Sequence, residues 1–224
     1  MAWAHNSFAP DMPFNQCLTV PTELTLREVA GEVRLCPEPL KELELLYGDK
    51  LVRKNSSVRK INKVTHGYPA TEYRLKLKLN QLIKPVSIEL NGLVITLDPV
   101  SHSIFCKGNL NGIEQFTKTV HRWQTFTDEG AVFGALNTAG EVELDIFVDR
   151  LIVEIFANRG EVYMPVSQFL YPDPVVGERG FGDDGNQHIS FFTPKRGITI
   201  ETEDKELIVE SFELYSMKSM WENQ

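Results

Sequence analysis

Apolar and polar residues alternate in several short stretches of the chain. The clearest stretch is "EYRLKLKLNQ", Glu72 to Gln81, in which every second residue is apolar and the residues between them are charged. A period of two places alternate side chains on opposite faces of a strand. This stretch therefore predicts a half-buried strand with Tyr73, Leu75, Leu77 and Leu79 on the buried face and Arg74, Lys76 and Lys78 in water.

Turn signals separate further alternating stretches. "VSIELNGLVITLDP", Val86 to Pro99, reads as a hairpin around Asn91-Gly92, because Asn-Gly is a strong two-residue turn signal. Alternation returns between Gly197 and Met217, and turn residues recur roughly every ten positions, a spacing typical of an all-β sandwich or barrel. The segment from Cys36 to Leu46 is the one place where a helical turn is expected, and an extended conformation fits it equally well.

The segment "ELDIFVDRLIVEIFANRGEVYMP", Glu143 to Pro165, predicts a three-stranded meander. Asp149-Arg150 suits a two-residue turn, and Asn158-Arg159-Gly160 suits a three-residue connection with a left-handed glycine. The buried face is predicted to hold Val142, Leu144, Ile146 and Val148. The opposite face is predicted to hold Glu141, Glu143, Asp145 and Asp149 together with Phe147.

Charge and cysteine content narrow the class of protein. The 224 residues carry a formal net charge of −8, which argues against nucleic acid or an anionic membrane as partners. We find neither a signal peptide nor a membrane-spanning run, and Cys17, Cys36 and Cys106 do not have metal-ligand spacing. The unpaired thiols are expected to be buried and favour a reducing, cytoplasmic location. No metal and no cofactor is predicted.

Three features of the sequence are candidate sites. Asp145 and Glu154 could be cross-strand neighbours that act as a glycosidase acid pair, although carboxylates on a solvated sheet face are the commoner explanation. The glycine-rich segment Gly177–His188, with Asp183 and Asp184, matches no phosphate or calcium loop and is expected to be a long turn. Trp123 lies in the polar context "VHRWQTF" and is the candidate for stacking on a sugar, with half-buried packing as the alternative. No catalytic residue is predicted.

Three segments resemble one family in the same order along the chain. "VDRLIVEIFANRGEVYM" is similar to the strand pair "VDRSSVEVFxNxGE" of the invertase, inulinase and levanase family of β-fructosidases. "MPFNQCLTVPTELTL" resembles that family's "MPxxxxMSxPRELTL", and "ELIVESFELYSMKSMW" resembles its closing strand "xxxxxLxVYxLKSIW". The resemblance spans nearly the whole chain.

The resemblance implies a two-sheet antiparallel β-sandwich of the jelly-roll or concanavalin-like kind. In the family this sandwich follows a five-bladed catalytic propeller, whose Trp-x-Asn-Asp-Pro, Arg-Asp-Pro and Glu-Cys motifs are absent from this sequence. Residues 1–26 are expected to be an extended arm related to the last propeller strands, and residues 27–224 the sandwich. The resemblance therefore implies a fold and transfers no catalytic residue.

The sequence leaves three functions open. The first is a non-catalytic sandwich module with a structural or carbohydrate-binding role, for which a β-fructan is the expected ligand. The second is a subunit that completes a separately made propeller. The third is an independent glycosidase that uses Glu154, Asp183 or Asp184. A sandwich without its propeller should expose an apolar interface, so we expect a homodimer, a propeller subunit, or the chain's own first residues to cover it.

Overall fold

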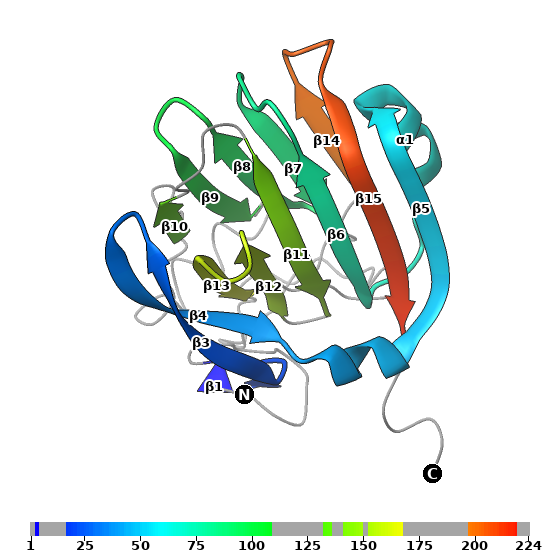
Figure 1. Cartoon of the computed structure of the whole chain (residues 1–224). Coiled ribbons are helices and arrows are strands. Elements are labelled where there is room, and N and C mark those ends of the chain that lie inside the picture. The colour runs from blue at the N-terminus through cyan, green and yellow to red at the C-terminus, as the bar shows by residue number, and fades with distance from the viewer. Residues whose placement is uncertain are drawn as a thin grey trace, which may run out of the picture.

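The computed structural model describes residues 3–4, 17–108, 132–135, 141–149, 152–167 and 197–218. Trp123 and the segment Gly177–His188 lie outside these residues, so both remain sequence-based expectations. Within the described residues two antiparallel sheets pack face to face, as predicted (Figure 1).

The larger sheet has six strands in the order β13-β12-β11-β6-β15-β5. In that order their bounds are Val162–Ser167, Ile152–Ala157, Val142–Val148, Tyr73–Leu79, Ile208–Met217 and Tyr47–Ser57. The smaller sheet has five strands in the order β10-β9-β8-β7-β14. Their bounds are Val132–Ala135, Ser103–Gly108, Leu93–Asp98, Val86–Leu90 and Ile198–Thr202.

The remaining elements lie outside the sandwich sheets. Two two-stranded sheets are formed by β1 with β2 and by β3 with β4, and a 3-10 helix η1 and an α-helix α1 flank β5. Their bounds are Trp3–Ala4 for β1, Cys17–Leu18 for β2, Thr22–Val29 for β3, Glu32–Pro39 for β4, Lys41–Leu46 for η1 and Val58–Thr65 for α1. The predicted arm boundary between residues 26 and 27 falls inside β3.

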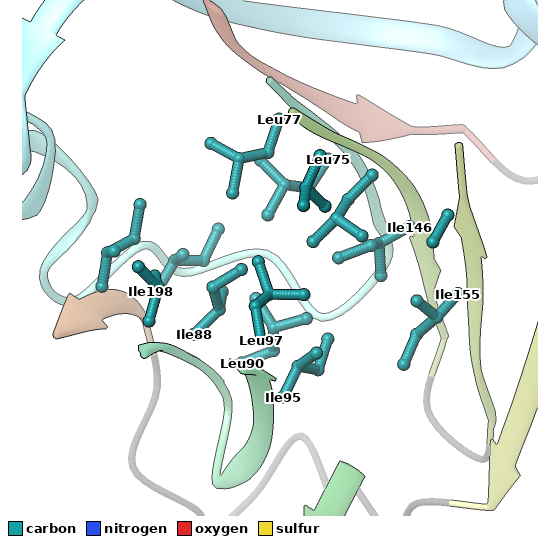
Figure 2. Close-up of a cluster of buried hydrophobic side chains, with 14 of the residues drawn as sticks. Leu75, Leu77, Ile88, Leu90, Ile95, Leu97, Ile146, Ile155 and Ile198 are labelled. Carbon is teal, nitrogen blue, oxygen red and sulfur yellow. The ribbon is translucent and has the colours of Figure 1, made fainter. Parts of the chain in front are cut away.

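The core forms from the apolar face that alternation predicts in each strand. Leu75, Leu77, Ile146 and Ile155 of the six-stranded sheet face Ile88, Leu90, Ile95, Leu97 and Ile198 of the other sheet (Figure 2). All nine are fully buried. The burial of these apolar side chains between the two sheets is the main stabilising contribution to the fold.

Several predicted elements are confirmed. The hairpin of β7 and β8 turns at Asn91-Gly92, where φ is 49° and 95°, the left-handed values that a type I′ turn requires. β11, β12 and β13 form the predicted meander. The predicted turn at Asp149-Arg150 is wrong in its position: Val148 pairs with Val153 and the Asp149 N–H donates to the Ile152 carbonyl at 2.9 Å, so Asp149 belongs to the ladder.

Two local predictions need correction. Arg74 was expected in water, yet it is 4% exposed. The helical turn expected within Cys36–Leu46 forms as η1 at Lys41–Leu46, after an extended stretch to Pro39. The prediction that no other segment is helical is wrong, because α1 forms at Val58–Thr65. Cys36 and Cys106 are buried, as predicted.

Candidate functional site: the outer face of the six-stranded sheet

The outer face of the six-stranded sheet, which points away from the five-stranded sheet, is covered at one end by the N-terminal segment. All six residues of β12 are buried, so this strand is shielded on both faces. Val153 and Ile155 enter the sandwich core, whereas Phe156 and Phe147 pack on the outer side against Leu43 of η1. The segment from Val20 to Leu46 thus forms a second, smaller apolar cluster on the sheet.

Glu154 lies at this covered end and is 1% exposed. Its Oε1 accepts a hydrogen bond from the Val20 N–H at 2.7 Å, and its Oε2 accepts one from the Tyr163 hydroxyl at 2.6 Å. Burial raises the pKa of the Glu154 carboxyl, while the hydrogen bonds from Tyr163 and Val20 act in the opposite direction. The expectation that this carboxylate faces water is therefore wrong: Glu154 ties the N-terminal segment to β12 and β13.

Asp145 is occupied by a different partner. Arg74 Nε and Nη2 donate to the two oxygens of Asp145 at 2.8 and 2.6 Å, and Arg74 Nη1 donates to the Tyr47 hydroxyl at 2.8 Å. The Arg74 guanidinium also lies over the Phe147 ring, 4.5 Å from its centroid. Burial lowers the pKa of Arg74, but the hydrogen bond and charge of Asp145 outweigh this and leave it raised.

Asp145 and Glu154 are diagonal neighbours on the outer face, because Asp145 pairs with Phe156 and Glu154 pairs with Phe147. A glycosidase needs one carboxyl that can donate a proton and one that can reach the sugar or a water. Here one carboxylate is held in a two-point ion pair, and the other has both oxygens engaged beneath the N-terminal segment. The described geometry does not present these two groups to a substrate.

The β3–β4 hairpin is fixed to the turn between β12 and β13. Arg27 Nη2 donates to the carbonyls of Asn158, at 3.1 Å, and of Arg159, and Arg159 forms two hydrogen bonds with Glu38 at 3.1 and 3.3 Å. Gly160 has φ of 80°, and a Cβ there would overlap the carbonyl oxygen of Pro37. A glycine is therefore required by both backbone conformation and close approach.

One face of this hairpin is not covered by the described residues. Directly opposed residues of β3 and β4 share a face, and one face carries four exposed apolar side chains. These are Leu24, Leu26, Val33 and Leu35, which are 60%, 72%, 73% and 58% exposed. Figure 1 shows the blue hairpin beside β12 and β13, at the end of the sheet far from β5.

Metal ligands, cysteines and long helices complete the picture of the described part of the chain. No group of three or more His, Cys, Asp or Glu residues is arranged there to hold a metal ion. Burial raises the pKa of the Cys106 thiol to about 12, so this cysteine is a protonated core residue at neutral pH. In these same residues no helix has the length and apolar character needed to cross a membrane.

The described features define an antiparallel β-sandwich with an N-terminal hairpin docked on its outer face. Residues 43–211 match the family "Glycosyl hydrolases family 32 C terminal", so the chain belongs to this family through its C-terminal domain. The resemblance to the β-fructosidases is thereby confirmed. The match begins after the β3–β4 hairpin.

Known relatives are much longer than this chain. It is 25% identical to the levanase of Bacillus subtilis (strain 168) over 182 residues, which cover 76% of this chain and 25% of the levanase. The exo-inulinase of Aspergillus awamori has a similar fold, with a TM-score of 0.67 and 15% identity over 97% of this chain and 39% of the inulinase. The sucrose-6-phosphate hydrolase of Lactobacillus gasseri gives a TM-score of 0.61 and 19% identity, covering 94% and 37%.

Sequence reasoning missed the burial of Arg74 and Glu154. A signal for Glu154 was present, because "IVEIFA" is a nearly continuous apolar run, a pattern typical of strands that are buried on both faces. A glutamate inside such a run must find hydrogen-bond donors. For Arg74 the sequence shows no comparable signal, since its neighbours alternate regularly.

Proposed function

We propose that this chain is a non-catalytic sandwich module of a glycosidase that hydrolyses β-fructans or sucrose, and that it stabilises the catalytic domain. The observation that carries the proposal is the exposed apolar face of the β3–β4 hairpin, formed by Leu24, Leu26, Val33 and Leu35. Exposed apolar patches of this kind mark interaction sites. The match to a C-terminal domain supports a catalytic domain as the partner that covers this face.

The test combines the purified chain with a separately produced catalytic domain of a family member whose own sandwich has been removed. Release of fructose from levan, inulin and sucrose and the thermal stability of the catalytic domain are both measured. We expect the wild-type chain to raise both. The double variant Leu26→Asp/Val33→Asp should fail, because two carboxylates would be buried without partners.

A matched control is Val100→Asp, which changes a side chain that is 80% exposed on a loop of the five-stranded sheet. This variant should behave as the wild type does. Equal effects of wild type, Leu26→Asp/Val33→Asp and Val100→Asp would contradict the proposal. If the chain alone instead sediments as a dimer in the wild type and as a monomer in Leu26→Asp/Val33→Asp, that result would assign the hairpin face to contact with a second copy of the chain.

Carbohydrate binding is a second candidate, favoured by the sugar-polymer and sucrose-ester substrates in the names of the relatives. Trp123 is the proposed stacking residue. Calorimetry against levan, inulin and sucrose would show heat of binding that Trp123→Ala abolishes. If calorimetry detects no heat of binding with any of the three sugars, only the structural role remains as the proposal.

A further inference from the structure

One region of the chain has a charge opposite to that of the whole. Residues 50–71 contain six basic residues and no acidic one, which leaves 17 basic and 31 acidic residues, a net charge of −14, for the rest of the chain. The net charge of −8 therefore hides a strong local asymmetry. We call Arg53, Lys54, Arg59, Lys60 and Lys63 the basic edge.

The fold gathers these residues at one border of the molecule. β5 is the outermost strand of the six-stranded sheet, and α1 follows it directly (Figure 1). α1 buries Ile61 and Thr65, and Asn62 is held by two hydrogen bonds to the Ile200 backbone at 2.8 and 2.9 Å. This anchoring turns the other face of α1 to solvent, where Arg59, Lys60 and Lys63 are exposed.

No residue of the basic edge forms an ion pair with another described residue. Ion pairs among the described residues use other basic side chains, namely Arg34, Lys50, Arg74, Lys76, Lys78 and Arg159. The first turn of α1 also contains no acidic residue, so the positive end of the helix dipole adds to the same field. Lysine on an outer strand can serve to prevent strand pairing, which accounts for Lys54 but not for three cations on a helix.

We propose that the basic edge binds a linear anionic glycan, such as a sulfated, phosphate-bearing or carboxylated polysaccharide. This inference rests on the proposed function as part of a carbohydrate-active enzyme. The acidic remainder of the chain repels polyanions, so binding is confined to this border and falls steeply with salt.

Two observations favour a glycan over the other polyanions. The aromatic side chain of this segment, Tyr68, is half-buried and makes a T-shaped contact with buried Tyr73, with ring centroids 5.8 Å apart, so it is not a freely exposed ring for stacking on nucleic-acid bases. On α1, Val64 is the sole large apolar side chain that is exposed, at 38%, so the helix has little to insert into a membrane.

The test measures binding of dextran sulfate, with uncharged dextran as the ligand control, at two salt concentrations. One triple variant removes the helical cations of the basic edge: Arg59→Gln, Lys60→Gln and Lys63→Gln. The matched variant removes three exposed lysines elsewhere, without ion pairs among the described residues: Lys41→Gln, Lys84→Gln and Lys205→Gln. Both variants change the net charge equally and leave the core intact.

We expect dextran sulfate to bind the wild type and the matched variant alike, and the basic-edge variant about tenfold more weakly, as the loss of three exposed charge contacts predicts. Uncharged dextran should not bind. Absence of binding to the wild type, or equal weakening in both variants, would overturn the proposal. Tighter binding of single-stranded DNA or phosphatidylserine vesicles through the same residues would replace the glycan by that partner.

A failure of this proposal can be told apart from a failure of the proposed function. Failure of dextran sulfate to bind leaves the stabilisation of a catalytic domain by the β3–β4 hairpin untouched. Conversely, the Leu26→Asp/Val33→Asp variant should bind dextran sulfate normally, because β3 and β4 lie at the other end of the six-stranded sheet. The two proposals therefore fail separately.

Discussion

Replacement of Glu154 by alanine gives the sharpest test of how the N-terminal segment is held. The change removes the acceptor for the Val20 N–H and the Tyr163 hydroxyl, both of which are part-buried donors. A hydrogen bond to a charged group is worth about 1.5–3 kcal/mol, so the loss of both bonds, together with the vacated volume, should lower the free energy of unfolding of Glu154→Ala by about 3–5 kcal/mol. Urea denaturation followed by circular dichroism measures this change.

A double-mutant cycle separates the hydrogen bonds from the cavity. Tyr163→Phe alone removes one donor, and in the Glu154→Ala background the same change removes a hydroxyl that has already lost its Glu154 acceptor. We therefore expect the double variant to be less destabilised than the sum of the single variants, with a coupling of about 1 kcal/mol or more. Additive losses, or a Glu154→Ala loss below about 1 kcal/mol, would refute the buried network.

The pH dependence of the same site follows from the direction of its pKa shift. Burial raises the pKa of Glu154 above the ordinary 4.5, so the folded state holds this proton more tightly than the unfolded state. Stability contributed by the protonated group is fully present below pH 4.5 and is lost as the pH rises through the folded pKa. Glu154→Gln cannot titrate, so its free energy of unfolding relative to wild type should increase over that window.

Three further outcomes test the packing. Gly160→Ala should lower the thermal midpoint far more than Gly31→Ala, because both positions have positive φ but only at Gly160 would the new methyl group overlap another backbone atom; equal shifts would contradict the close approach. Asp145→Asn leaves the Arg74 guanidinium, whose side chain is 5% exposed, without its carboxylate and should lower the free energy of unfolding by about 3 kcal/mol. Cys106 is buried, so it should resist alkylation at pH 8 until urea unfolds the chain, as peptide mass spectrometry can show. Rapid labelling of the native protein would mean that the thiol is accessible.

Alternation along single strands was enough to predict most of the sandwich. Leu75 and Leu77 enter the core where the period of two places them, and Asn91-Gly92 turns the β7–β8 hairpin. These features depend on local sequence and on one buried face per strand. The family could also be predicted from the sequence, because three short segments of the chain resemble the family's motifs in the same order.

The outer face was not predictable in the same way. Glu154 is buried because residues from Val20 to Leu46, far away in sequence, fold across the sheet. Arg74 is enclosed by Asp145, Tyr47 and Phe147, which come from other strands. The short helix α1 was missed because its apolar face is defined mainly by Ile61, with polar Asn62 and Thr65 completing it through bonds to the backbone of Ile200 and Ile198. Such tertiary partners leave no periodic trace in the sequence.

The position of β15 has a consequence for how the protein is made. This strand, Ile208–Met217, is among the last described residues, yet it lies between β5 and β6 and pairs with both. Nearly all of these residues must therefore leave the ribosome before the six-stranded sheet can close. Until β15 is available, β5 and β6 lack the strand that pairs with both of them. Folding of this sandwich is consequently tied to the synthesis of β15, and a chain that stops before Ile208 would leave a gap in the middle of the sheet.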